Sequence, residues 1–299
     1  MTNVGDVTEA NLEDMIVPES FAQKWFRLAR QKKLGAFGAV VIIAMVLMAV
    51  FANTVSPYDP LENNYTRILE APSSNHWLGT DRFGRDILSR IIHGSRTALF
   101  IGILSAFLGA TMGLFLGLVS GYFGGTFDLI FMRFVDLFMA FPPLIMVMAI
   151  VATFGNELHF VVFAISISIV PDSTRIIRSN ALQIRRFPYV DAAVSLGFGH
   201  ARIILRHMLP NVMASYLIIF TAAVGGAILA EAALSFLGLG VNEPLPAWGL
   251  MLQGGTEESM TGVYWTAVFP GLAITLAVFA FFVWGDALRD LLDPRLRRK

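Results

Sequence analysis

Residues 34–52 read LGAFGAVVIIAMVLMAVFA, an apolar run without a single charged side chain. A helix needs roughly 20 such residues to cross about 30 Å of hydrocarbon, whereas the apolar core of a secretory signal has about 7 to 15. A basic stretch leads into the run, with Lys24, Arg27, Arg30, Lys32 and Lys33. The run is therefore interpreted as a retained first membrane helix rather than a cleaved signal.

Five further apolar stretches follow the first one, at residues 98–120, 134–154, 160–177, 212–239 and 264–288. The whole chain is 56% hydrophobic and 15% charged, a balance that fits lipid rather than water as the main solvent. Cysteine is absent, which excludes disulfides and thiolate chemistry, and a net charge of zero gives no sign of nucleic-acid binding. The sequence predicts an all-α, polytopic membrane protein with six transmembrane helices.

Lysine and arginine predict the orientation of these helices, because cytoplasmic segments retain positive charge during insertion. Six spans place both termini on one side, and seventeen of the 22 basic residues fall on that side. The other five, Arg67, Arg82, Arg85, Arg90 and Arg96, all lie in the long first loop. We expect both termini to be cytoplasmic. The predicted parts are a cytoplasmic N-terminal segment (1–33), the first helix with a long outside loop (34–97), a core transmembrane domain (98–288) and a cytoplasmic tail (289–299).

Small residues recur at every fourth position of the second span: Ser105, Gly109, Gly113, Gly117 and Gly121. Residues four apart share one face of a helix, and small side chains let helices approach closely in lipid. The stripe predicts a helix contact. The contact partner is left open between another helix of this chain and a second membrane subunit.

The loop at residues 185–210 is expected to lie in the cytoplasm and to be folded rather than linker-like. Pro188 suits the first turn of a helix, Asp191 adds negative charge near its start, and Gly197 and Gly199 would end or bend it. A second apolar stretch then runs to Pro210. The pattern predicts a short helix, a glycine break and another short helix. A surface-lying amphipathic hairpin is the simpler alternative.

The spacing within this loop resembles the EAA loop of ABC importer permeases. The matching positions are Asp191, Ala192, Ala193, Gly197, His207, Leu209 and Pro210. Asp191 stands where the family has Glu, and His207 stands where it has Ile. The literal triplet that begins at Glu231 is rejected, because Leu237 replaces the required glycine and the triplet lies in a membrane span. The resemblance implies that small Ala192 and Ala193 let the loop enter a groove on a cytoplasmic ATPase.

Three further segments are similar to the C-type permeases of dipeptide, oligopeptide and nickel importers. They are HWLGTDRFGRDILSR at 76–90, AEAALSFLGLG at 230–240 with Pro246, Trp248 and Gly249 after it, and GDALRDLLDPRLR at 285–297. The resemblance implies a type I ABC importer permease fold in a bacterial inner membrane. It implies as partners a homologous B-type permease subunit, two ABC ATPase subunits and a periplasmic or lipid-anchored substrate-binding protein. Peptides are the expected cargo, with nickel, glutathione or another small solute as alternatives.

The first of these segments is expected to form a short interfacial helix before the second span. One face of this helix would be apolar, with Ile87, Leu88, Ile91 and Ile92, and Arg85, Arg90 and His93 would lie away from it. Two roles remain open for its charged residues, which are Asp81, Arg82, Arg85 and Asp86. They anchor the loop, or they receive a substrate-binding protein.

The sequence predicts a transport subunit without an ATPase of its own. A Walker A site needs a lysine after its glycines, and no lysine occurs between Lys33 and Lys299. ATP and magnesium are therefore assigned to partner subunits, with no catalytic residue, cofactor or metal site in this chain. Four acids lie in or beside spans: Asp136, Asp172, Glu231 and Asp286. Glu231 is a candidate for the translocation path, and an ion-coupled secondary transporter is a remote alternative that leaves the loop pattern unexplained.

Overall fold

The computed structural model describes residues 32–292, so most of the predicted terminal segments 1–33 and 289–299 lie outside the described residues. Within 32–292 every regular element is a helix, apart from an isolated bridge between Thr80 and Asp86. The elements are α3 (Lys33–Val50), α4 (Ala52–Val55), α5 (Ile87–Phe123), α6 (Gly125–Met139), α7 (Pro143–Phe154), α8 (Leu158–Ile184), α9 (Pro188–Ser195), α10 (His200–Arg202), η1 (Ile203–Met208), α11 (Leu209–Phe236), α12 (Trp248–Ser259) and α13 (Trp265–Leu292).

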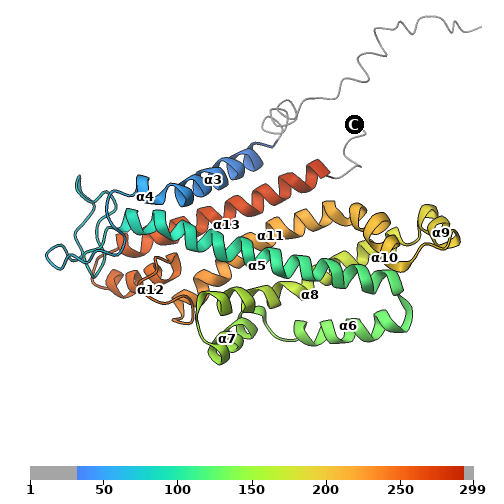
Figure 1. Ribbon diagram of the computed structural model, residues 1–299. Helices are drawn as coiled ribbons and strands as arrows, with labels where there is room; N and C mark the ends of the chain where they lie inside the picture. The colour runs from blue at the N-terminus through green and yellow to red at the C-terminus, as the bar shows by residue number, and fades with distance from the viewer. Residues whose placement is uncertain (1–31, 293–299) are drawn as a thin grey trace, which may run out of the picture.

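The long helices α3, α5, α8, α11 and α13 lie side by side and form the body of the molecule (Figure 1). One end of this body, here called the α9 end, carries α9 together with the start of α3 and the last turns of α13. The opposite end, here called the loop end, carries the irregular segment 56–86 and α12. The two ends of the described chain therefore lie on the same side, as an even number of crossings requires.

Five of these helical stretches are long and apolar enough to cross a membrane, and the count is six if the bent pair α6 and α7 forms one span. The all-α fold with up to six spans is thus confirmed within residues 32–292. The predicted boundaries are less accurate. The second span is part of α5, whose 37 residues extend about 55 Å, and the fourth span continues in α8 to Ile184. Helices continue as polar turns beyond the apolar windows that reveal them.

The third predicted span, 134–154, is not one straight helix. It falls across α6 and α7, which are bent by 81° relative to one another. The break lies at Pro142 and Pro143: a proline has no backbone N–H, and it disfavours helical geometry in the residue before it. Pro142 accordingly adopts an extended conformation, and Pro143 occupies the first turn of α7.

The fifth span begins earlier than its apolar pattern suggested. Helical residues continue from His200 through η1 and α11 to Phe236 without a break. Pro210 lies near the start of α11, where its ring would meet the carbonyl of Arg206 in a regular α-helix. The π-helical turn Ile203–Met208 directly before it widens the backbone at this point.

The stripe of small residues on α5 packs against α8 of the same chain. A Cβ atom added to Gly113 would lie 2.4 Å from Ser173 Cβ, and one added to Gly117 would lie 2.7 Å from the Thr174 carbonyl oxygen. Gly109 and Gly121 meet α8 in the same way, and the Ser105 hydroxyl donates to the Val162 carbonyl at 3.2 Å. The stripe therefore faces a helix of this subunit, so the seam with a second subunit is not at these positions.

Replacing Gly113 with leucine is expected to destabilise the α5–α8 contact by about 1 to 3 kcal/mol, because the added side chain has no space. Gly226 on α11 is the matched control, since a Cβ there meets nothing within 4 Å. Thermal unfolding of purified G113L and G226L in the same detergent measures the difference. A G113L protein as stable as G226L would contradict the close packing.

Candidate functional site

The loop between α8 and α11 has the predicted organisation of helix, glycine break and second helix. Pro188 occupies the first turn of α9, and Asp191 lies exposed in that turn. Gly197 then adopts a φ of +76°, a left-handed conformation that side-chain-bearing residues rarely adopt. Gly199 follows with an ordinary φ of −65° and begins α10. The turn at Gly197 thus sets the angle at which α9 projects from the body.

The two faces of α9 have different surroundings. Val190 and Ala193 are buried, in a cluster of apolar side chains from α5, α8, α11 and η1. Ala192, Val194 and Leu196 are exposed, Leu196 by 73%. Of the two alanines predicted to approach an ATPase, only Ala192 is accessible. The methyl group of Ala193 packs against the chain itself, so a direct contact with an ATPase is expected of Ala192 and stays a prediction.

The remaining positions of the EAA-like pattern stabilise the loop from within. The His207 ring stacks on the Phe198 ring, with centroids 6.0 Å apart. The Arg202 guanidinium lies over the same Phe198 ring, 4.7 Å from its centroid. Leu209 packs against the buried cluster below α9. These side chains hold the glycine break against the body and lie between α9 and α11.

A second connection joins this loop to α5. The Tyr122 hydroxyl, in the last turn of α5, lies 2.7 Å from His200 Nδ1. The rings of Tyr122 and Phe123 both contact the His200 ring edge-on or tilted, with centroids 5.5 and 5.6 Å away. The loop is therefore attached to α5 as well as to α11.

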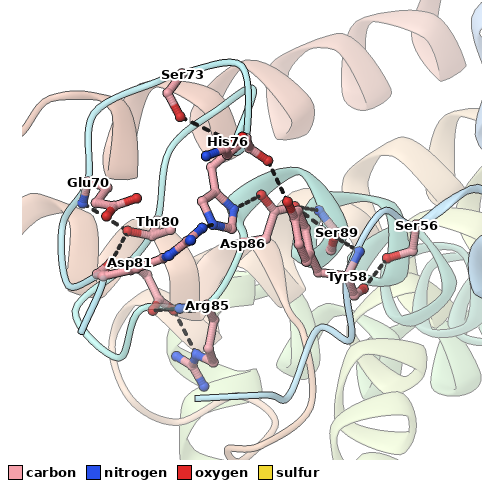
Figure 2. A network of polar contacts seen from close by, with 12 residues as sticks. Ser56, Tyr58, Glu70, Ser73, His76, Thr80, Asp81, Arg85, Asp86 and Ser89 are labelled. Atoms are coloured by element: carbon pink, nitrogen blue, oxygen red, sulfur yellow. Dashed lines mark hydrogen bonds and ion pairs between the residues drawn. The ribbon is translucent and has the colours of Figure 1, made fainter. Parts of the chain in front are cut away.

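At the loop end, the signature segment 76–90 folds into a polar network that begins α5 (Figure 2). Asp86 caps the helix: its carboxylate accepts hydrogen bonds from the Ser89 backbone N–H at 2.8 Å and from the Ser89 hydroxyl at 2.7 Å. Its other oxygen lies 2.9 Å from Nδ1 of His76, and Arg67 donates to the other nitrogen of that ring. Because Arg67 can only donate, Nδ1 carries the proton of His76.

The turn before Asp86 is closed by further polar contacts. The Asp81 carboxylate accepts from the backbone N–H groups of Phe83 and Arg85 and from the Arg85 side chain at 2.7 Å. Gly84 has a φ of +72°, and a Cβ there would lie 1.8 Å from the Asn64 carbonyl oxygen. The glycine at this position of the signature is thus required by both the turn and the close approach of the loop.

Two arginines connect this turn to a distant part of the chain. Arg85 donates to the Glu243 carboxylate at 2.9 Å, and the Arg90 guanidinium lies 3.7 Å from the same carboxylate and 3.8 Å from Asp81. Arg90 is only 1% exposed and also donates to the Pro60 carbonyl. Arg85 and Arg90, expected on the face away from the isoleucines, are buried, because carboxylates from two loops compensate their charges in the interior.

These contacts distinguish between the two roles left open for the signature. Asp81, Arg85 and Asp86 are directed inward and bond within the chain, which makes them anchors of the loop. Arg82 alone is exposed, with a 3.6 Å contact to Glu257 on α12. Among the four charged residues, only Arg82 remains available to a protein that docks on this end.

The sequence does not identify Glu243, which lies between Gly240 and Pro246 of the second family-like segment. It is 158 residues from Arg85 along the chain, so no local pattern connects the two. Burial would raise the pKa of the Glu243 carboxyl, but the hydrogen bond from Arg85 and the charges of Arg90 and Arg85 leave that pKa below its ordinary value.

Glu231, the candidate for the translocation path, is 1% exposed within α11. Its carboxylate accepts a 2.7 Å hydrogen bond from the Ser235 hydroxyl one turn later. A Cβ added to Gly240 or Gly249 would collide with Ser235, which shows how closely the following loop covers this turn. In this conformation Glu231 faces its own chain and lines no open path.

Of the three other acids in or beside spans, Asp136 pairs with arginines. It lies 2.6 Å from Arg175 and 3.9 Å from Arg133. Asp172 and Asp286 are exposed. Asp128, which the sequence reasoning missed, is buried and bonds to Arg178 and, at 2.5 Å, to the Ser120 hydroxyl. This contact attaches the start of α6 to α5 and α8.

Comparisons with known proteins agree with this arrangement. A family model described as the binding-protein-dependent transport system inner membrane component matches residues 113–298. A second model, the N-terminal TM domain of oligopeptide transport permease C, matches residues 20–72. Proteins named glutathione transport system permease protein GsiD, from Escherichia coli O157:H7, Shigella boydii serotype 4 and Shigella sonnei, are each 37% identical over 292 residues. Those alignments cover 96% of this chain and 96% of each relative.

Replacing Glu243 with glutamine is expected to destabilise the loop end, because Arg85 and Arg90 then share only Asp81. The free energy of unfolding should fall by about 1 kcal/mol, since the Glu243 side chain is 42% exposed and solvent screens its ion pair with Arg85. E257Q is the matched control, because Glu257 is 74% exposed in its contact with Arg82. Thermal unfolding of both variants at neutral pH measures the difference.

The pH dependence of this difference identifies its cause. A carboxyl whose folded pKa is depressed stabilises the fold above its unfolded pKa, about 4.3 for Glu, and the effect is lost as the pH falls through the folded pKa. The difference in thermal stability between wild type and E243Q should therefore become smaller in acid. A gap that stays constant down to acid unfolding would contradict an ion-pair origin.

Proposed function

This chain belongs to the family of binding-protein-dependent transport system inner membrane components and is an ABC importer permease, and from that premise we propose its partners, orientation and cargo. It shares the type I ABC permease fold of that family. In this proposal the chain forms the translocation path with a homologous B-type permease. Two ABC ATPase subunits bind ATP and magnesium on one side, and a periplasmic or lipid-anchored binding protein delivers cargo on the other.

The α9 end is proposed to face the cytoplasm. Basic residues support this orientation: Arg175, Arg178, Arg185, Arg186, Arg202 and Arg206 all occur between the middle of α8 and η1. The arginines of the loop end are compensated by acids there, as the contacts of Arg85 and Arg90 illustrate. Arg175 and Arg178 pair with Asp136 and Asp128, but the other four make no ion pair with a residue of the described range 32–292. Positive charge without an acidic partner therefore gathers at the α9 end, the distribution expected of a cytoplasmic side.

The two-faced packing of α9 is the observation that carries the coupling role. Its outer face exposes Ala192, Val194 and Leu196, an apolar surface of the kind that enters a groove on a partner. Its inner face, through Val190 and Ala193, is part of the same buried cluster as α5, α8 and α11. An ATPase that moves α9 would thus move three spanning helices, which is what alternating access requires. A loop that merely lies on a membrane surface would not need an inner face packed this way.

Replacing Gly197 with valine is expected to reduce ATP-dependent uptake about tenfold or more, because a β-branched residue at a φ of +76° strains the turn by about 1 to 3 kcal/mol. Gly199→Ala is the matched control. A Cβ meets nothing within 4 Å at either glycine, and only Gly197 has a left-handed backbone. Uptake and ATPase activity in proteoliposomes of the assembled importer measure both variants. Unchanged uptake by G197V at normal membrane levels would contradict the coupling role.

We propose a peptide-class cargo, with glutathione as its first candidate. The family context is peptide transport, and the GsiD proteins that resemble this chain over 96% of its length are named for glutathione transport. Glutathione is itself a small peptide, so the two indications agree.

The cargo is tested on the binding protein that works with this importer. Glutathione should bind it and should stimulate ATP hydrolysis by the assembled complex in proteoliposomes, whereas unrelated dipeptides should compete poorly. Stimulation by dipeptides alone would contradict glutathione as the cargo and leave the coupling role of α9 intact.

A further inference from the structure

A cavity of about 660 Å³ lies at the α9 end between the start of α3 and the last turns of α13. It is separate from α9 and from the loop-end network. The two helices approach closely just beyond it: a Cβ added to Gly35 would lie 2.3 Å from Ala287 Cβ, and one added to Gly38 would lie 2.6 Å from a Val283 methyl group. This contact closes the inner end of the cavity.

The cavity combines an apolar part with a charged part. Leu34, Val283 and Ala287 contribute apolar surface, and the charged side chains lie at the helix termini. Beyond the cavity, apolar side chains continue along the outer face of α3, where Leu34 and Val40 are each 64% exposed. A charged compartment therefore borders the hydrocarbon, where a lipid headgroup lies above its own acyl chains.

The charges within the cavity favour an anion. Lys32 pairs with Asp290 at 2.7 Å, so these two charges cancel. Lys33 and Arg289 make no ion pair with any residue of the described range 32–292, and the single carboxylate of Asp286 opposes them. The sequence on both sides adds positive charge, with Lys24, Arg27 and Arg30 before α3 and four basic residues between 295 and 299 after α13.

We propose that this cavity binds the phosphate of an anionic phospholipid headgroup. Lys33 and Arg289 contact the phosphate, and the acyl chains run along the exposed face of α3. Basic pockets between membrane helices are suited to such headgroups, because ionic attraction and burial of the acyl chains act together. The site does not depend on which solute the importer carries.

Native mass spectrometry of the full chain, released from nanodiscs that contain phosphatidylcholine with a minor share of phosphatidylglycerol or cardiolipin, tests the proposal. The wild-type protein should retain anionic lipid in preference to phosphatidylcholine. K33Q and R289Q should each weaken that retention about fivefold, and the double variant should weaken it further, because each juxtamembrane cation contributes independently.

R133Q is the matched control, because it also removes one positive charge. Arg133 lies on α6 outside the cavity, and its side chain is 76% exposed. R133Q should retain anionic lipid like the wild type. Two results would overturn the proposal: equal loss in R133Q, which indicates general surface attraction, or displacement of the lipid by inorganic phosphate, which indicates a site for soluble anions. Normal thermal stability of K33Q and R289Q shows that any loss of lipid is not caused by misfolding.

Discussion

The contact between α5 and α8 is the interaction on which the rest of this molecule depends. Lipid tails give helices no hydrophobic reason to associate, so close van der Waals approach must supply the attraction. Four glycines on α5 allow the backbone of α8 to come within a distance that no methyl group would permit. Because α5 carries the Asp86 cap at one end and Tyr122 at the other, this contact also fixes the position of both polar ends.

The sequence predicts well what depends on neighbours along the chain. Apolar windows reveal the spanning helices, and the glycine at 197 lies in the left-handed turn that its position suggested. The sequence predicts poorly the burial of side chains whose contacts lie far away along the chain. Helical periodicity places Arg90 only on the face away from the isoleucines and does not reveal that Glu243 and Asp81 compensate its charge in the interior. Ala193 looked equivalent to Ala192, since a short pattern does not reveal which face of a helix meets the body.

The two ends of the molecule have contrasting constructions. At the loop end, segment 56–86, the start of α5 and the 237–247 loop are joined by ion pairs and a capped helix, which favour a single geometry. The loop that carries α9 is connected by aromatic contacts and apolar packing around Phe198 and His200, together with the Tyr122–His200 hydrogen bond. Packing of this kind resists separation but allows sliding, so it suits an element that must move while it remains attached.

The bend at Pro142 and Pro143 has a consequence for the environment of the chain. Ending one helix and starting another leaves terminal carbonyl and N–H groups without helical partners, here in the middle of an apolar stretch. Hydrocarbon offers no hydrogen bonds to such groups, so bare backbone at that depth must be shielded by protein or hydrated. The surface around Phe141, 61% exposed in the isolated chain, is thus unsuited to bulk lipid. An isolated subunit would therefore expose unpaired backbone groups at this bend.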